Sequence, residues 1–350
     1  MEVDAKIALI PKIKKMENKI PLYNPFDEMD FHFGKCFLTG EKVEKENIQE
    51  VFFPWMIQKF GISSKRLSFL SGDQMEYQNF KLPLSSTALS SGWADIQKHA
   101  EDLLQAGTAA IPFIQEDKLH AYLCQLWYGV LYHEYFLAKN KLNDRNQQLF
   151  DDRVINRVQM LHYVLQSHLG KIKIEGFRPF SVFLFKVHEV KGSNGFDFRT
   201  GLNAFTLSLR VGDLGIIVAL LDNAVQKKFY TDYFKMFQAV TLHPIQFDEL
   251  YSMVTYKSFL MNNLYEYGIS LPTDEVPETV LGMRIPENLA ETPVFQDWDE
   301  SVYAQVLLSN LKPYGMEMND VFHPDHGTAT FLEDGKGNVL VMDEVGNPLD

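Results

Sequence analysis

The chain has 350 residues, of which 46% are hydrophobic and 23% are charged, and its formal net charge is −13. This length exceeds the usual size of one hydrophobic core and predicts two domains, while the hydrophobic content excludes a disordered protein. The excess of acidic residues disfavours passive attraction to nucleic-acid phosphates. No apolar run is long enough to cross a bilayer, and the first residues lack the pattern of a secretion signal. We therefore expect a cytoplasmic protein with no membrane contact.

The negative charge is concentrated near one end of the chain. Residues 291–350 contain twelve acidic and two basic side chains, which leaves 34 acidic and 31 basic residues upstream. We interpret this end as a solvated acidic segment that aids solubility. A basic groove in the first 290 residues is compatible with the sequence, although no concentrated stripe of lysine or arginine is present.

A turn containing a cysteine is the feature around which we expect the chain to be organised. Cys36-Phe-Leu-Thr-Gly40 has the length and terminal glycine of a zinc knuckle, in which two cysteines direct their thiolates at one ion. The second ligand position holds Thr39, a far weaker ligand. Residues 48–53 then predict a short strand, and Pro54 favours the first turn of a helix.

Two further motifs extend this pattern. Residues 49–56 read QEVFFPWM, and residues 82–89 read LPLSSTAL before a predicted helix. In order and spacing, the three motifs resemble the HNH-type endonucleases with a treble-clef zinc fold. The bacterial members of that family open with C-x-x-C-G, continue with E-H-V-F-P-x-W-L and close with L-P-V-C-x-x-C-N. The apolar frame of each motif is kept, while most of its polar chemistry is replaced.

The resemblance implies four zinc-ligand positions, and most of them hold residues that do not bind zinc. Only Cys36 is a cysteine, whereas Thr39, Ser85 and Ala88 occupy the other positions. Three lost ligands imply no tetrahedral zinc, and we expect no cofactor. The position of the family's catalytic histidine holds Glu50. That histidine is a general base beside a divalent ion, and Glu50 without such an ion would repel a phosphate.

The rest of the chain predicts helices, then strands, then further helices. Short turns between the apolar runs favour an antiparallel meander. We predict an α+β protein with a degenerate HNH-like module at residues 1–115 and a helical and antiparallel-sheet domain at residues 116–350. Residues 268–300 are acidic and rich in proline and predict a long loop, and a terminal hairpin is expected at residues 328–342. The other predicted helices cover residues 93–106, 117–140, 150–169, 225–237 and 246–262, and the predicted strands cover residues 179–190, 205–211 and 214–221.

Several polar groups outside the three motifs are candidate sites. His133 and Glu134 begin a zinc-protease motif, but Leu137 occupies the place of its second histidine, so we predict a solvated or hydrogen-bonded pair. We expect the second cysteine, Cys124, to be a small core residue. The best basic cluster is interpreted as a solvated helix face and comprises Arg145, Arg153 and Arg157. The weak metal candidates near the end of the chain are His323, Asp325 and His326.

The leading hypothesis is a non-catalytic relative of the HNH nucleases that acts as a binding or interaction module. The alternative is a nuclease with a rebuilt divalent-metal site around Glu50, with help from residues 323–326. A third hypothesis is a small-molecule site in the aromatic-rich second part, which would need a pocket with convergent polar groups. The partner is not specified by the sequence; the resemblance implies nucleic acid, although the net charge does not favour it.

Overall fold

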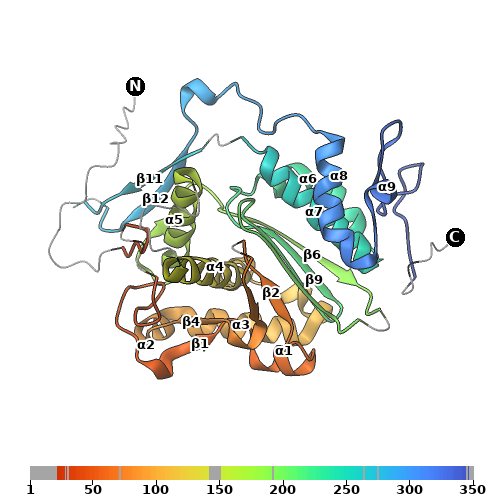
Figure 1. The fold of residues 1–350 in the computed structure, drawn as a ribbon. Coiled ribbons are helices and arrows are strands. Elements are labelled where there is room, and N and C mark those ends of the chain that lie inside the picture. Colours follow the sequence, from red (N-terminus) through yellow and green to blue (C-terminus); the bar gives the residue numbers. More distant parts are fainter. Residues whose placement is uncertain are drawn as a thin grey trace.

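The computed structural model describes residues 22–27, 29, 31–70, 72–141, 151–190, 193–262, 265–273, 276–343 and 346, with side chains omitted beyond residue 137 in the helix that ends at Lys141. Helices combine with mainly antiparallel sheets, so the protein belongs to the α+β class. In the described residues, no helix is both long and apolar enough to span a bilayer. Figure 1 shows a sheet in the middle of the molecule with helices on both of its sides.

The N-terminal part is built from short elements. Strand β1 pairs antiparallel with β4, with Glu50 opposite Lys81, and β2 pairs antiparallel with β3. Pro54 begins the first helix, as predicted, because its missing N–H costs nothing there. These elements are β1 (Ile48–Glu50), α1 (Pro54–Lys59), β2 (Arg66–Ser68), β3 (Gln74–Glu76), β4 (Lys81–Pro83), α2 (Ser86–Ala88), a π-helical turn (Leu89–Trp93) and α3 (Ala94–Ala106).

Two longer helices, α4 (Glu116–Lys141) and α5 (Asp152–Ser167), follow and confirm the predicted ones. Helix α4 is buried around most of its circumference and packs against the N-terminal elements. Gly129 permits this close approach, because a Cβ at that position would lie 2.9 Å from Val51 Cγ2. Helix α4, the first helix of the predicted second domain, thus belongs to the hydrophobic core of the predicted first domain.

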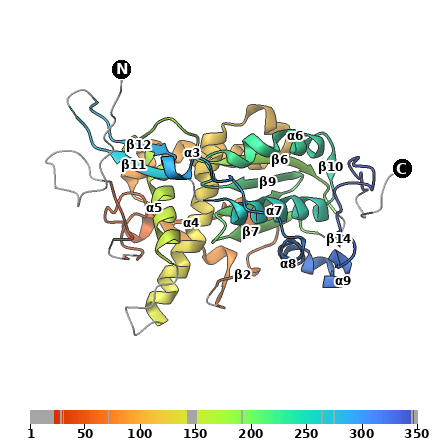
Figure 2. The ribbon, with the colours of Figure 1, turned by 90° about the horizontal axis from the view of Figure 1, so that it is seen from above.

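The central sheet has five strands in the order β10-β6-β9-β8-β7. The three predicted strands correspond to β6, β8 and β9, and β9 pairs antiparallel with both of the others. Strand β7, which was not predicted, pairs antiparallel with β8, and β10 adds a parallel edge next to β6. Helices α6 and α7 lie over one face of this sheet (Figure 2). The elements are β6 (Ser181–Val187), β7 (Phe196–Gly201), β8 (Thr206–Val211), β9 (Leu214–Ala219), α6 (Val225–Gln238), β10 (Thr241–Leu242) and α7 (Pro244–Leu260).

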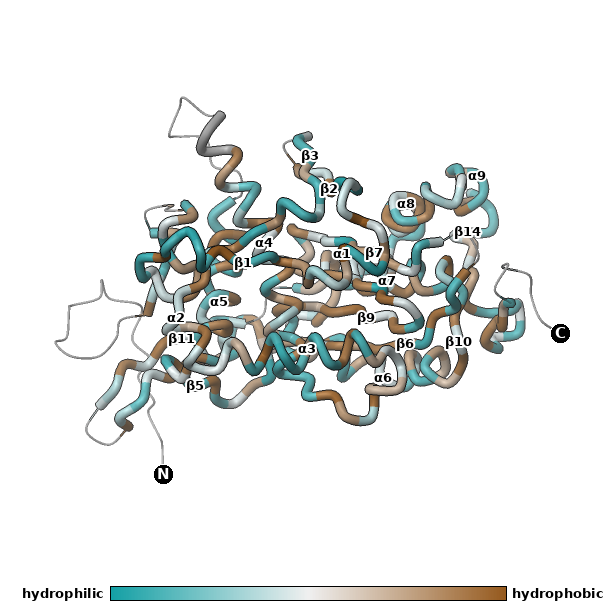
Figure 3. Tube along the Cα trace, turned by 90° about the horizontal axis from the view of Figure 1, so that it is seen from below, coloured by the Kyte–Doolittle hydropathy of each residue, from teal (hydrophilic) through white to brown (hydrophobic). Residues whose placement is uncertain are grey.

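Alternation along the strands separates two cores. On β9, Ile216 and Val218 face the N-terminal elements and α4, whereas Ile217 and Ala219 face α6 and α7. Hydrophobic segments accordingly gather along the central strands (Figure 3). The first core runs from Phe26 to Leu281 without interruption at the predicted boundary. The division near residue 115 stays a prediction.

A three-stranded sheet lies partly in the region predicted as loop. Strands β11 (Glu266–Ser270) and β12 (Val280–Arg284) pair antiparallel, and β12 pairs parallel with β5 (Lys173–Ile174). The prediction of one long loop over residues 268–300 was therefore wrong. Pairing with β5, about a hundred residues away, stabilises strands that local sequence does not reveal.

The last part of the chain packs against α7, which lies between it and the second core. Helix α8 contributes Tyr303, Leu307 and Leu311 to a third core. The predicted terminal hairpin was also wrong in extent, because no extended strand pair forms among the described residues of this segment. A Glu333–Val339 bridge and backbone hydrogen bonds from Leu340 N to Leu332 O and from Asp334 N to Asn338 O mark it. The elements are α8 (Glu300–Leu311), α9 (Met318–Val321), β13 (Phe322–His323) and β14 (Gly327–Thr328).

Candidate functional site

The predicted knuckle is a tight turn. Gly40 N donates to Cys36 O at 2.9 Å, and Cys36 N donates to Glu41 O at 2.7 Å. Gly40 has a φ of +71°, and a Cβ there would lie 2.5 Å from the Tyr23 ring. Both the backbone conformation and the space therefore require glycine. Cys36 lies fully buried at the start of this turn.

A second turn carries the other two candidate positions. Ser85 caps the short helix α2, because its Oγ accepts a hydrogen bond from Ala88 N at 3.1 Å. Both residues are buried. Strand β4 leads directly into this turn and is fixed by its pairing with β1. The motif spacing thus places Ser85 and Ala88 on either side of one turn.

The two turns meet. Thr39 Oγ1 lies 3.4 Å from Ser85 Oγ, and Phe37 N donates to Pro83 O at 2.9 Å. Behind the knuckle, His162 Nε2 lies 2.6 Å from Phe37 O, and burial lowers the pKa of this histidine to about 4. A neutral imidazole from α5 therefore holds the back of the turn. The structure brings the turns of all four candidate positions to one place.

Hydrogen bonds and one cation occupy this meeting point. Thr39 Oγ1 donates to Glu41 Oε2 at 3.2 Å. The pKa of Glu41 is lowered mainly by a hydrogen bond from Ser85. Hydrogen bonds from Thr39 and Thr87 and the positive charge of Lys171 lower it further. Burial lowers the pKa of Lys171, while the nearby Glu41 and Cys36 raise it. This donor set does not fit zinc, because two hydroxyls and an alanine stand at three of the four positions where thiolates are needed.

Glu50 lies apart from any metal-binding group. It ends β1 with an exposed side chain opposite Lys81 of β4. The neighbouring Gln49 faces inward, where its Oε1 accepts a hydrogen bond from Gln97 Nε2 at 3.1 Å. In the described part of the chain, no three His, Cys, Asp or Glu residues are grouped so that they could hold a metal ion. Glu50 is consequently a solvated carboxylate on a two-stranded sheet.

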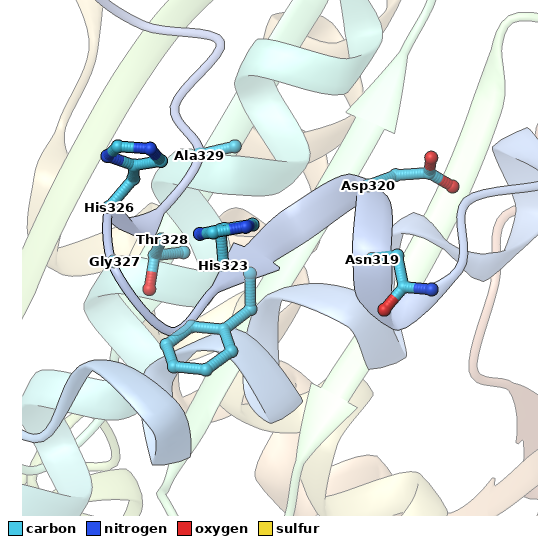
Figure 4. A pocket seen from close by; sticks show the side chains of 8 residues that line it. Asn319, Asp320, His323, His326, Gly327, Thr328 and Ala329 are labelled. Carbon is cyan, nitrogen blue, oxygen red and sulfur yellow. The ribbon is translucent and has the colours of Figure 1, made fainter.

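Two of the three candidates near the end of the chain, His323 and His326, line a hollow of about 130 Å³, whereas Asp325 is not among its lining residues (Figure 4). The rings of His323 and His326 stack with centroids 4.9 Å apart. His323 Nδ1 accepts a hydrogen bond from Asp325 N at 3.2 Å and lies 4.0 Å from its carboxylate. The carboxylate of Asp320 points away from both rings in Figure 4. Stacked imidazoles do not aim two nitrogens at one ion, so this arrangement gives the metal hypothesis no support.

His133 and Glu134 are hydrogen-bonded, as one of the two predicted alternatives had it, but they are buried rather than solvated. His133 Nε2 lies 3.0 Å from Lys81 O, and burial lowers its pKa to about 4. Glu134 Oε1 accepts a hydrogen bond from Leu70 N, next to β2. The pair therefore fastens α4 to β4 and to the hairpin of β2 and β3. The apolar circumference of α4 was the signal that its polar residues would be buried.

Cys124 is a buried core residue, as predicted. Its Sγ lies 3.2 Å from Nε2 of His120, whose ring stacks on Phe180 at 3.9 Å. Burial raises the pKa of the Cys124 thiol well above its usual value and lowers the pKa of His120 to about 3. Both groups are thus neutral, and an inaccessible neutral thiol is no nucleophile.

Of the three arginines predicted on a solvated face, Arg145 lies outside the described residues and Arg153 is exposed. Arg157 differs, because its guanidinium is half-buried and stacks 4.1 Å from the centroid of Phe205. Burial lowers the pKa of Arg157. Sequence spacing alone did not distinguish this stacked arginine from its exposed neighbour.

Fold and site define an α+β protein whose N-terminal turns are joined without a metal-binding residue set. No protein-family model, no curated protein and no solved structure matches the chain.

Proposed function

We propose that the N-terminal part is a degenerate HNH-like module, built on a treble-clef arrangement, that works in binding or interaction and not in cleavage. The observation that carries the proposal is the 3.4 Å approach of Thr39 Oγ1 to Ser85 Oγ. Two distant motifs that the resemblance assigns to one zinc site lie side by side. The residues at that point cannot complete such a site.

Packing and hydrogen bonding take over the role that the resemblance gives to zinc. Cys36 and Ala88 are fully buried, and the knuckle is held by His162 and by the backbone of β4. Lys171 supplies positive charge beside Cys36 and Glu41. A scaffold stabilised in this way needs no ion, and its exposed surface can serve a partner.

The alternative is a divalent-metal-dependent nuclease around Glu50. Its support is the position of Glu50 in the second motif, where the family carries its catalytic histidine. Nuclease chemistry on a phosphate needs a positioned cation, and the exposed Glu50 faces Lys81 across the strand pair. A single carboxylate beside a lysine is a poor divalent-ion site, so binding is the function that the geometry favours.

Restoring the cysteines tests the proposal. The triple variant Thr39→Cys, Ser85→Cys, Ala88→Cys should bind one zinc ion together with Cys36, measured by competition with a chromogenic chelator. The matched control is the triple variant Thr39→Cys, Ser85→Cys, Thr87→Cys, in which the third cysteine stands one residue away, on the exposed side of the turn. It should bind zinc at least about tenfold more weakly, because one thiolate would point away from the ion.

Equal zinc affinity of the two triple variants would contradict the shared origin of the four positions. The non-catalytic part is tested on the unmodified chain with DNA and RNA in the presence of magnesium or manganese. We expect no cleavage. Metal-dependent cleavage that Glu50→Ala abolishes would establish the nuclease alternative.

A further inference from the structure

Three aromatic rings surround the ammonium group of Lys257 on α7. Its Nζ lies 4.4 Å from the ring centroid of Trp298, 5.3 Å from that of Tyr230 and 5.7 Å from that of Phe295. Each distance is within the range of a cation–π interaction. Tyr230 belongs to α6, and the other two rings belong to the segment that precedes α8. We call Tyr230, Phe295 and Trp298 the aromatic cage.

The walls of the cage are fixed in place. Trp298 Nε1 donates to Glu300 Oε1 at 2.9 Å, and the Trp298 ring packs edge-on against Tyr256 at 4.6 Å. Phe295 forms a backbone bridge with Met261 at the end of α7. These contacts hold the rings independently of the lysine between them. A preorganised cage loses little entropy when it accepts a cation.

Charge and exposure suit an external cation. The three rings and Lys257 are half-buried, so solvent reaches the cage. The surrounding segment carries Asp297, Asp299 and Glu300 and no basic residue. Across the described residues, Lys257 forms no ion pair with any carboxylate. Its ammonium group therefore lies against the faces of the three rings.

An aromatic cage is better matched to methyl groups than to N–H groups. A lysine ammonium carries three hydrogen-bond donors, and ring faces replace their water partners poorly. A quaternary ammonium has no N–H and loses less hydration on entering the cage, while it keeps the full cation–π attraction. Such a group would compete with Lys257, whose long side chain can swing out into solvent.

We propose that the aromatic cage binds a small quaternary ammonium compound, with Lys257 as the internal cation that the ligand displaces. This inference is independent of the proposed function of the N-terminal module, which lies on the other face of the central sheet. The ligand belongs to the chemical class of choline and betaine.

The test is a titration of the unmodified chain with choline, followed by NMR on the indole N–H of Trp298. The matched probe is 3,3-dimethylbutan-1-ol, which has the shape of choline but no charge. We expect saturable binding of choline and binding of the neutral compound that is at least about tenfold weaker. Lys257→Ala should strengthen choline binding about tenfold by removing the competing cation, whereas Lys228→Ala on the exposed face of α6 should not change it.

The variant Trp298→Leu assigns the indole N–H resonance of Trp298, because that signal disappears. The same variant should not bind choline, which is measured by NMR on the ligand. Circular dichroism checks that each variant is folded. No saturable binding by the unmodified chain would overturn the proposal, even if Lys257→Ala binds choline, because the lysine would then be a permanent part of the cage. Equal binding of choline and its neutral analogue would also overturn it.

Discussion

The knuckle and the central helix α7 hold distant segments together by different means. At the knuckle, the four ligand positions carry small uncharged side chains, and buried contacts, the approach of Thr39 to Ser85 and the Ser85 cap hold the turns, with the Glu41 carboxylate at their edge. Helix α7 keeps buried carboxylates. Asp248 accepts hydrogen bonds from Arg199 Nη2 at 2.8 Å and Tyr314 OH at 2.7 Å. The buried contacts of the knuckle need no ion, whereas the buried carboxylates of α7 make stability depend on their hydrogen-bond partners.

Glu249 is the second buried carboxylate of α7. Thr330 Oγ1 donates to it at 2.7 Å and Phe331 N at 2.6 Å. Gln246 Nε2 donates to the carbonyls of Phe331 and Leu340. The polar residues of α7 therefore clamp the last part of the chain onto the helix. The acidic end, interpreted from sequence as a solvated segment, is in these places docked.

The largest expected effect is on the buried ion pair. Arg199→Met should destabilise the protein by about 3 to 5 kcal/mol, because buried Asp248 would lose its charged partner and would have to take up a proton or stay unpaired. Arg284→Ala removes an exposed pair with Glu266 and should cost less than about 1 kcal/mol. Urea unfolding compares the two variants. If the two variants lose similar amounts of unfolding free energy, the buried Arg199–Asp248 pair contributes no more to stability than the exposed pair.

Glycine substitutions probe the knuckle. Gly40→Ala should cost about 2 to 4 kcal/mol, because it adds strain at positive φ and a clash with the Tyr23 ring. Gly61→Ala is the control, since Gly61 also has positive φ but a Cβ there would meet no atom within 4 Å. It should cost about 1 kcal/mol. If both variants unfold at the same urea concentration, Tyr23 does not restrict the turn.

Buried Glu249 predicts a pH effect on α7. Burial raises its pKa to about 7, so the folded state holds a proton that the unfolded state releases near pH 4.5. Stability from this group is complete below pH 4.5 and is lost as the pH rises through 7. Glu249→Gln should therefore flatten the fall in stability between pH 5 and 8 by about 1 to 3 kcal/mol. Parallel pH curves for both proteins would contradict the assignment.

The smallest expected effect concerns the cap at the second turn. Ser85→Ala should destabilise the protein by about 1 kcal/mol, because Ala88 N loses its hydrogen-bond acceptor. Ser90→Ala removes an exposed hydroxyl that donates to Thr87 O and should change stability less. Thermal unfolding of the two variants measures the difference. A larger loss at Ser90 would show that the Ser85 cap does not hold the turn.

Local periodicity predicted the elements that bury a broad apolar surface. The predicted helix at residues 117–140 corresponds to α4, Glu116–Lys141, because many turns repeat the same pattern. Strand β7 (Phe196–Gly201) was missed, since its FDFRTG sequence alternates only briefly. Strands β5 and β12 depend on a partner far along the chain. Such pairing leaves little trace in either segment alone.

The candidate site was predictable in part. Motif order singled out Thr39 and Ser85, and the structure places their hydroxyls together. The cation beside them was not predictable, because Lys171 follows α5, more than eighty residues after Ser85. Burial of His133 was missed because residue type favours exposure, and only the apolar surroundings on α4 indicate otherwise.

Metal analysis of the purified chain tests the central claim most directly. We predict that elemental analysis finds no stoichiometric zinc and that EDTA leaves the melting temperature unchanged, because buried contacts and hydrogen bonds already join the two turns. One zinc ion per chain, or a lower melting temperature after chelation, would contradict the account.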